Sequence, residues 1–422
     1  MNPIRRSTLA HGLRVVTEQV PGARAFNLGV FVGVGSRDES PDEHGCSHFL
    51  EHVLFKGTPS RDAEQISAEI ERFGGDLNAY TTREYTCFHA RVLHSQADVA
   101  LDVLTDMLAN SLIRPADVAT EREVILDEIA MHDDDPGEVA IEGAIGKLFA
   151  GSRLGPTVIG SATSIRRMPT RRITDFWRRH YTSNRMVVSA VGDLDHDDLC
   201  ARLAGFDAAL APSPGGEVAR PAAHHATEPR IFRRSNELAQ TSVVLAFPGF
   251  GTLDPRREAL SLLAVALGGG MSSRLFQEVR ERRALAYTID CSEAAWRDAG
   301  LVTIDWQALP ERTPEILDVV HRIVADVRQH GITADELAAA KGQLLGQTVL
   351  HFENPGARMS RLGGAELAGD RRGIEDLLTD IRAVTLAEVN TLAAQVLGRV
   401  PVVSMAGAAG SRAAARRLQT AW

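Results

Sequence analysis

Two histidines four residues apart, with a glutamate just before the second, are the residues in this chain best suited to chemistry. His48, Glu51 and His52 form a His-x-x-Glu-His pattern. On a helix, the 3.6-residue period places His48 and His52 on one face, one turn apart, with Glu51 beside them. Two neutral imidazoles arranged in this way can bind one zinc ion, and Glu51 can deprotonate a metal-bound water. The alternative interpretation is an ordinary amphipathic helix with solvated histidines.

The residues before the pattern predict that a helix begins there. Ser40 is a typical N-cap residue, Pro41 follows at the first helical position, and Glu43 lies three residues after the cap, as in a capping box. We therefore expect a helix from Ser40 that carries His44 on the same stripe as the two motif histidines. Cys46 would point to the opposite side and is not expected to bind the metal.

A third metal ligand is needed, and the helix predicted to begin at Pro115 offers candidates. Glu121 and Glu128 are seven residues apart, close to two helical turns, so their carboxylates fall on one face. A carboxylate from a separate helix would complete a His, His, Glu set and leave the fourth zinc position to water. On this pattern alone, the simpler interpretation is that Glu121, Glu123 and Glu128 form a solvated face.

Composition narrows the class of protein. The chain has 422 residues, 44% of them hydrophobic and 24% charged, with a formal net charge of -9 and four cysteines. This length accommodates two or more domains. The cysteines are scattered, which fits a reducing compartment, and no basic stripe favours nucleic acid. Because no apolar signal core or membrane-spanning run is present, we expect a cytoplasmic protein that does not bind membranes.

Hydrophobic periodicity predicts strands and helices throughout the chain, including a helix capped by Ser60 and an edge hairpin at 76–92. The stretch 211–229 has loop composition, so we predict a linker there between an N-terminal domain at 1–210 and a C-terminal domain at 230–422. The predicted strands of the first half are 13–18, 26–34, 76–80, 85–92 and 186–193, and its later helices are 95–108, 115–129, 139–149 and 170–180.

The second half repeats the order of elements of the first. A strand at 241–247, a helix from Pro255, paired strands and two long helices follow one another at similar spacing. In the shared register, Ala340 stands opposite Glu121 and Gln347 opposite Glu128. A residue required for packing should recur in both copies, so this asymmetry favours a chemical role for Glu128.

Four blocks together resemble the pitrilysin-like zinc peptidases with the inverted motif, and among these the bacterial homologues of the catalytic subunit of mitochondrial processing peptidase. The blocks are 45–52, Asn78–Thr81, Glu121–Glu128 and Arg280–Tyr287. The resemblance covers essentially the whole chain and implies that His48, His52 and Glu128 bind one zinc ion per chain. Glu51 would be the catalytic base, and Glu121 would support the site.

The resemblance also implies how substrate binds and what fold to expect. Asn78, Ala79 and Tyr80 match an edge strand to which family members add an extended substrate. Arg280 and Tyr287 match a pair that contacts substrate and stabilises the developing oxyanion. Without the resemblance, they would be a surface arginine and a buried strand tyrosine. The implied fold is α+β, with two tandem similar domains, each a mostly antiparallel sheet flanked by helices, forming a clam-shell around a chamber.

These features predict a zinc endopeptidase or oligopeptidase that acts on unfolded or presequence-like peptides as a homodimer. One alternative is a non-catalytic partner or scaffold subunit of a processing-peptidase-like assembly, against which the intact ligand set argues. Another is a metal-binding or nucleotide-binding module that uses Gly268–Gly270, although this stretch lacks the context of a phosphate-binding loop.

Overall fold

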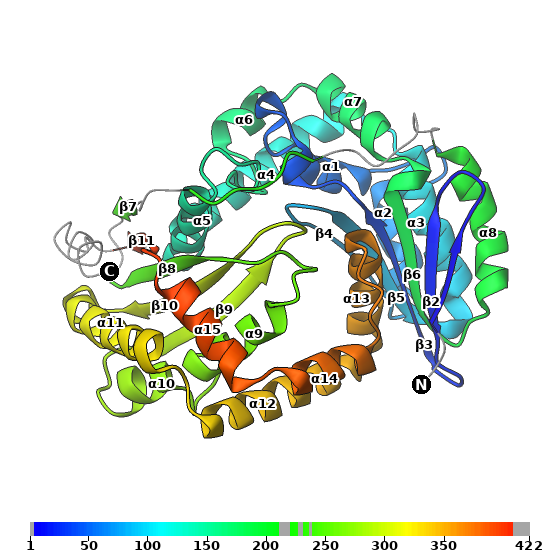
Figure 1. The fold of residues 1–422 in the computed structure, drawn as a ribbon. Helices are drawn as coiled ribbons and strands as arrows, with labels where there is room; N and C mark the ends of the chain where they lie inside the picture. The colour runs from blue at the N-terminus through cyan, green and yellow to red at the C-terminus, as the bar shows by residue number, and fades with distance from the viewer. Residues whose placement is uncertain (1–3, 211–219, 227–230, 236–238, 408–422) are drawn as a thin grey trace. The chain divides into compact units, whose positions relative to one another are not determined.

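The computed structural model describes residues 4–210, 220–226, 231–235 and 239–407, which form two compact units of sheet and helix (Figure 1). The division between the units falls inside two long helices, α4 and α12. The first unit contains Met1–Ile129, Pro156–Arg220 and Leu350–Arg371, and the second contains Ala130–Gly155, Pro221–Val349 and Arg372–Trp422.

The first unit combines a six-stranded sheet with helices that include the predicted motif helix. Its strands are β1 Ile4–Thr8, β2 Arg14–Gln19, β3 Ala25–Val32, β4 Asp76–Thr81, β5 Thr86–Leu93 and β6 Met186–Gly192. Its helices are α1 Cys46–Leu54, α2 Ala63–Glu71, α3 Ala97–Asn110, most of α4 Pro115–Asp134, α6 Ala162–Arg167, α7 Thr170–His180, α8 His196–Ala209 and α13 Pro355–Ala368.

The second unit combines a five-stranded sheet with a similar set of helices. Its strands are β7 Ile231–Ser235, β8 Thr241–Gly249, β9 Thr288–Ala295, β10 Gly300–Ala308 and β11 Val402–Gly407. Its helices are α5 Pro136–Leu148, α9 Arg257–Leu267, α10 Arg274–Phe276, α11 Thr313–His330, most of α12 Ala334–Phe352, α14 Ile374–Ala383 and α15 Leu386–Leu397.

The strand orders confirm the repeat that the sequence predicted. The first sheet runs β1-β2-β6-β3-β5-β4, and the second runs β7-β11-β8-β10-β9. When β1 is left out, the two orders correspond strand by strand: β2, β6, β3, β5 and β4 match β7, β11, β8, β10 and β9. In both sheets one pair is parallel, β2 with β6 and β7 with β11, and the other pairs are antiparallel. The predicted α+β fold of two similar domains is therefore confirmed, and β4 lies at a sheet edge as expected.

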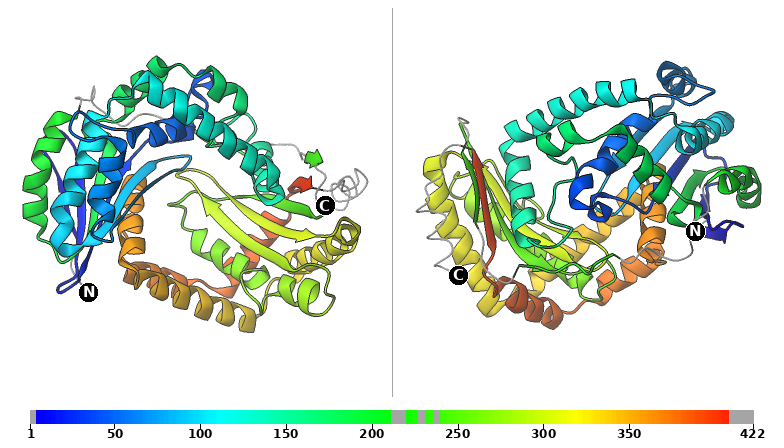
Figure 2. Two further views of the ribbon diagram at one scale, coloured as in Figure 1. Left: turned by 180° about the vertical axis from the view of Figure 1, so that it is seen from behind. Right: turned by 90° about the horizontal axis from the view of Figure 1, so that it is seen from above.

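One face of each sheet is covered by a helix from the other half of the chain. Helix α13 packs on β2, β3 and β6, and α5 packs on β7, β8 and β11 (Figures 1 and 2). The two helices begin alike: Asp135 and Asn354 cap them through side-chain oxygens, and a proline follows each cap. The compact units therefore interleave along the chain, whereas the sequence suggested two continuous halves, 1–210 and 230–422. Of the predicted linker 211–229, only residues 220–226 are described.

The predicted start of the motif helix at Ser40 is wrong. Ser40 and Glu43 do form a capping box, but it caps a 3-10 turn, Pro41–Glu43. Gly45 then adopts a left-handed backbone conformation, with a φ of +89°, and α1 begins at Cys46. His44 consequently lies outside the helix, and its ring nitrogen Nε2 is 3.1 Å from the carbonyl of Thr157.

The predicted cap of the second helix is also wrong. Asp62, rather than Ser60, accepts the hydrogen bond from the N–H of Gln65 at the start of α2. Ser60 instead donates to Asp106, at 2.6 Å. Among the described helices, none is both long and apolar enough to cross a membrane.

Candidate metal centre

The motif helix buries one side and presents its histidines on the other. Phe49, Leu50 and Val53 of α1 are fully buried in the core of the first unit. The rings of His48 and His52 lie on the opposite stripe, with their centroids 4.7 Å apart. Cys46 is buried on the core side, as its position in the pattern predicted. The hydrophobic period of α1 therefore aims both imidazoles in one direction.

Glu128 of α4 meets both histidines. Its Oε1 is 3.6 Å from His48 Nε2, and its Oε2 is 3.5 Å from His52 Nε2. Ligand atoms of the three residues all lie within 4.8 Å of one another. Around a tetrahedral zinc ion with bonds of about 2.1 Å, neighbouring ligand atoms are roughly 3.4 Å apart. The three side chains thus fit a zinc ion with little adjustment.

Glu121 supports this group from about two turns before Glu128 on α4. Its Oε2 is 3.1 Å from His52 Nδ1, and its Oε1 is 2.6 Å from Lys56 Nζ. A carboxylate on Nδ1 holds the tautomer that leaves Nε2 available to a metal. Burial acts to lower the pKa of His52, but its hydrogen bonds to Glu128 and Glu121 outweigh this effect and raise it.

Glu51 is placed beside the histidines and is held by strand β4. Thr81, the last residue of β4, donates to Glu51 Oε2 at 2.5 Å. Burial raises the pKa of Glu51, and the hydrogen bond from Thr81 opposes this shift. A carboxylate with a raised pKa is a stronger proton acceptor, so this environment suits a general base.

Three residues with polar contacts around the group were not predicted from the sequence. Lys56 pairs with Glu121, Thr81 holds Glu51, and Glu39 binds the N-terminus of α1. The period of the strand could have indicated Thr81, because Leu77, Ala79 and Thr81 lie on the same face of β4, the one that faces the core. Glu39 and Lys56 reach the site through loop geometry, which no periodicity reports.

Strand β4 presents the predicted substrate edge. Among the described residues it pairs only with β5, so its other edge has no strand partner. Ala79 packs against the core, whereas the ring of Tyr80 meets that of Tyr85 edge to face, with ring centroids 6.0 Å apart. Asn78 Oδ1 accepts a hydrogen bond from the N–H of Ala79.

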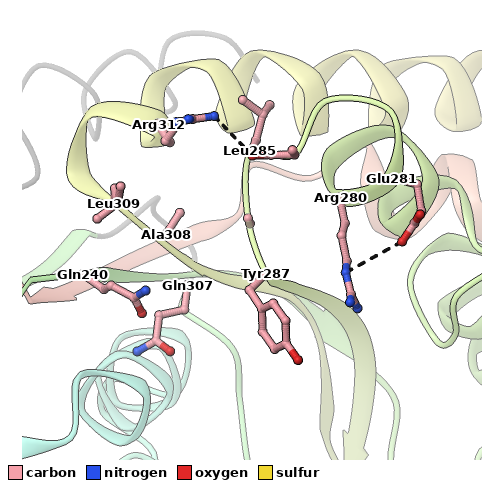
Figure 3. A pocket seen from close by; sticks show the side chains of 11 residues that line it. Gln240, Arg280, Glu281, Leu285, Tyr287, Gln307, Ala308, Leu309 and Arg312 are labelled. Carbon is pink, nitrogen blue, oxygen red and sulfur yellow. Dashed lines mark hydrogen bonds and ion pairs between the residues drawn. The ribbon is translucent and has the colours of Figure 1, made fainter.

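Arg280 and Tyr287 form a stack on the second unit. The Arg280 guanidinium carbon lies 4.8 Å from the ring centroids of both Phe276 and Tyr287. The interpretation of Tyr287 as a buried strand residue is wrong, because 75% of it is exposed. Both residues line a cavity of about 440 Å³, which Gln240, Gln307 and Arg312 also border (Figure 3).

The backbone near this stack is unusual in two ways. Arg280 lies in a π-helical segment, Gln277–Glu281, and Ala284 has a φ of +50°. Such features concentrate at functional sites.

Gly268 has a packing role, since a Cβ there would lie 2.3 Å from the backbone nitrogen of Cys291. The Gly268–Gly270 stretch follows the C-terminus of α9 and is not a phosphate-binding loop.

Comparison with known protein families finds two consecutive matches. Residues 14–161 match the model described as insulinase, peptidase family M16. Residues 170–344 match the model described as the peptidase M16 inactive domain. The first match contains every residue of the candidate metal group, and the second contains Arg280 and Tyr287.

Several curated bacterial proteins, each named an uncharacterized zinc protease, are similar over nearly the whole chain. One from Streptomyces coelicolor is 40% identical and covers 98% of this chain and 91% of its own. One from Mycobacterium tuberculosis is 42% identical, over 97% of this chain and 94% of its own. YmxG from Bacillus subtilis is 33% identical, over 93% and 95%.

Solved structures share the fold at lower identity. A peptidase M16 inactive domain from Pseudomonas fluorescens has a TM-score of 0.88 and 22% identity, and it covers 96% of this chain and 98% of its own. A protease from Helicobacter pylori has a TM-score of 0.87 and 19% identity, over 96% and 100%.

Proposed function

Since the chain belongs to peptidase family M16, the insulinase family of metallopeptidases, we propose that it hydrolyses peptide bonds at one zinc site per chain. His48, His52 and Glu128 would hold the ion. The observation that carries this proposal is the grouping of their ligand atoms within 4.8 Å of one another. A zinc ion bound there supplies a Lewis acid and lowers the pKa of water toward neutrality.

Glu51 would act as the general base. It lies on α1 between the two histidines, and Thr81 fixes one of its oxygens. Its raised pKa favours removal of a proton from the attacking water and later delivery of that proton to the leaving amine. Glu121 would act through His52 rather than on the substrate, because both of its oxygens already have partners in the protein.

The free edge of β4 supports a substrate bound as an added strand. Main-chain hydrogen bonds along Asn78, Ala79 and Tyr80 would give affinity that depends little on sequence, which suits unfolded or presequence-like peptides. Thr81 ends this strand and binds Glu51, so a peptide on β4 would lie near the base. Resemblance to the processing peptidases supports endopeptidase or oligopeptidase activity in a homodimer, which the mass in solution would test.

The decisive experiment compares Glu51→Gln with the unchanged protein on a quenched peptide, with bound zinc measured in both. We expect Glu51→Gln to lower kcat about 10²- to 10⁴-fold, because a general base contributes on that scale, and to retain zinc. Glu123→Gln is the matched control, since Glu123 is an exposed residue of α4. Full activity of Glu51→Gln at equal zinc content would contradict the mechanism.

Arg280 and Tyr287 would contribute donors for the developing oxyanion. We expect Tyr287→Phe to lower kcat roughly 10- to 100-fold, somewhat below the loss seen when an oxyanion donor is removed from other enzymes. Zinc content should not change. Glu123→Gln, at an exposed position of α4, again serves as the control. Equal kcat in Tyr287→Phe and the unchanged protein would remove Tyr287 from the proposal.

A second candidate function is that of a non-catalytic partner or scaffold subunit. The observation that favours it is the match of residues 170–344 to a domain described as inactive. The intact ligand group in the first unit speaks against it. Stoichiometric zinc without any peptide cleavage by the purified chain would favour this second function.

A further inference from the structure

The N-terminus of the motif helix cannot be capped by its own N-cap residue. Gly45 occupies that position with a φ of +89° and has no side chain. A Cβ at Gly45 would lie 2.8 Å from Ile165 Cδ1 and 2.9 Å from the Cα of Gly160, so a serine or asparagine does not fit. The N–H groups that open α1 therefore need an acceptor from elsewhere in the chain.

Glu39 is that acceptor. Its Oε2 accepts from the N–H of Gly45 at 2.8 Å, and its Oε1 accepts from the N–H of Ser47 at 2.7 Å. Only 6% of Glu39 is exposed, so both bonds are shielded from water. Ser47 directly precedes His48, and the carboxyl therefore fixes the backbone next to the first metal ligand.

The loop that carries Glu39 is itself tied to the hairpin of the proposed substrate strand. The N–H of Ser36 donates to the carbonyl of Thr82 at 3.3 Å, and the N–H of Arg37 donates to the carbonyl of Arg83 at 2.8 Å. These two acceptors follow β4 directly. Buried Arg37 also pairs with Glu84 at 2.6 Å. Residues 36–39 thus connect the start of α1 to the end of β4.

A second anchor holds the same loop. The Arg220 guanidinium donates to both oxygens of Asp38, each at 2.8 Å, and to the carbonyl of Glu84 at 2.5 Å. Asp38 in turn accepts from the N–H of Gly35. The position of the Glu39 carboxyl is therefore set by the hairpin and by Arg220, independently of α1.

We propose that Glu39 is a positioning residue that holds α1, with His48 and Glu51, at a fixed place relative to strand β4. This inference rests on the proposed function. In the second copy, Pro255 stands near the counterpart of Glu39, and the carboxylate of the neighbouring Asp254 accepts from the N–H of Arg256, the residue before α9. That cap is local, whereas Glu39 joins α1 to a loop that is hydrogen-bonded to the residues after β4.

The test uses cobalt-substituted protein, whose visible absorption reports the ligand geometry whether or not the chain cleaves peptides. Glu39→Gln keeps one acceptor and turns the other into a donor that faces a backbone N–H. We expect it to change the cobalt spectrum, to weaken zinc binding roughly 10- to 100-fold and to lower kcat by a similar factor with little change in KM.

Asp62→Ala is the matched control, because Asp62 caps α2 in the same unit through one hydrogen bond of 2.9 Å. Its melting temperature should fall while its cobalt spectrum and kcat stay unchanged. A Glu39→Gln protein that loses stability but keeps the spectrum and kcat would overturn the proposal, as would one that fails to fold. Failure of the proposed function would show differently, as Glu51→Gln retaining full activity.

Discussion

The two units share a sheet order but differ in the helices that bear polar groups. In the first unit α1 and α4 bring His48, His52 and Glu128 together. The corresponding helices of the second unit, α9 and α12, have no such group among the described residues. The clearest contrast is one buried position, where Glu121 is 4% exposed and its counterpart Ala340 is 3% exposed.

This pair of residues shows that the fold requires a small or paired side chain at the buried position but does not require a carboxylate there. Alanine fills the buried position on α12 without any polar partner. A carboxylate at that depth costs free energy unless it is paired, and Glu121 is paired with both His52 and Lys56. The second unit therefore indicates the default for packing, and the first shows a more costly arrangement that the proposed zinc site would explain.

The comparison is tested most strongly by removing the carboxylate ligand. We expect Glu128→Gln to weaken zinc binding by about 10² or more, because one of three protein ligands is lost, and Glu121→Gln by roughly tenfold. Gln347→Ala, at the counterpart position in the second unit, should have no effect. Competition with a chromophoric chelator measures all three. Equal zinc retention in Glu128→Gln and Glu121→Gln would show that the ligand assignment is wrong.

A second difference between the units concerns a buried titratable group. His180 ends α7, whereas α15 in the second unit ends with buried Leu397. Burial, together with the neighbouring Arg185 and Arg179, lowers the pKa of His180 to about 4. The folded state thus keeps this ring neutral between about pH 4 and 6.5, where the unfolded chain takes up a proton.

Because the pKa of His180 is lower in the folded state than in the unfolded chain, the first unit should lose stability in acid. Stability from His180 is complete above pH 6.5 and is lost as the pH falls toward 4, by about 3 kcal/mol in total. His180→Gln should flatten the dependence of unfolding free energy on pH in this window. Hydrogen exchange of the first unit between pH 4 and 7 measures it, and an unchanged slope would contradict the assignment.

The smallest expected effect concerns α5 and α13, the helices that each cover a sheet formed mainly by the other half of the chain. Both place a glycine against an aromatic ring: a Cβ at Gly363 would lie 2.1 Å from Phe31, and one at Gly143 would lie 2.2 Å from Phe232. Phe31 is fully buried, whereas Phe232 is only partly buried, so its ring has fewer neighbours that resist a shift. We expect Gly363→Ala to cost about 2 kcal/mol by overpacking and Gly143→Ala less. Urea unfolding measures both, and the reverse order would contradict this account of the packing.

Much of the site could be predicted because it depends on short-range regularities. The helical period paired His48 with His52, the two-turn spacing aligned Glu121 with Glu128, and the absence of Glu128 from the second copy of the repeat favoured a chemical role for it. The hairpin pattern at 76–92 predicted a sheet edge, and β4 lies at one. Apart from the repeat, these features depend on residues that are close together in the sequence.

The remainder depends on contacts that local patterns do not encode. The capping box at Ser40 was real, but the left-handed Gly45 ended its turn before α1 began. Glu39 reaches α1 across a loop whose course is set by Arg220, far along the chain. The helix at 139–149 was predicted from its hydrophobic period, but nothing in that period says that α5 covers the sheet of the second half of the chain.

Because α13 covers a sheet formed by the first half of the chain, its late position in the sequence has a consequence for synthesis on the ribosome. Strand β6 completes the first sheet at Gly192, but the helix that covers one face of that sheet begins only at Pro355. At 5 to 20 residues per second, the nascent chain would wait roughly 10 to 35 s for this cover. During that interval an apolar surface stays open to water. It comprises Val16, Phe31, Cys87, Val187 and Val191. The first half of this chain would therefore keep this surface exposed until α13 has been translated.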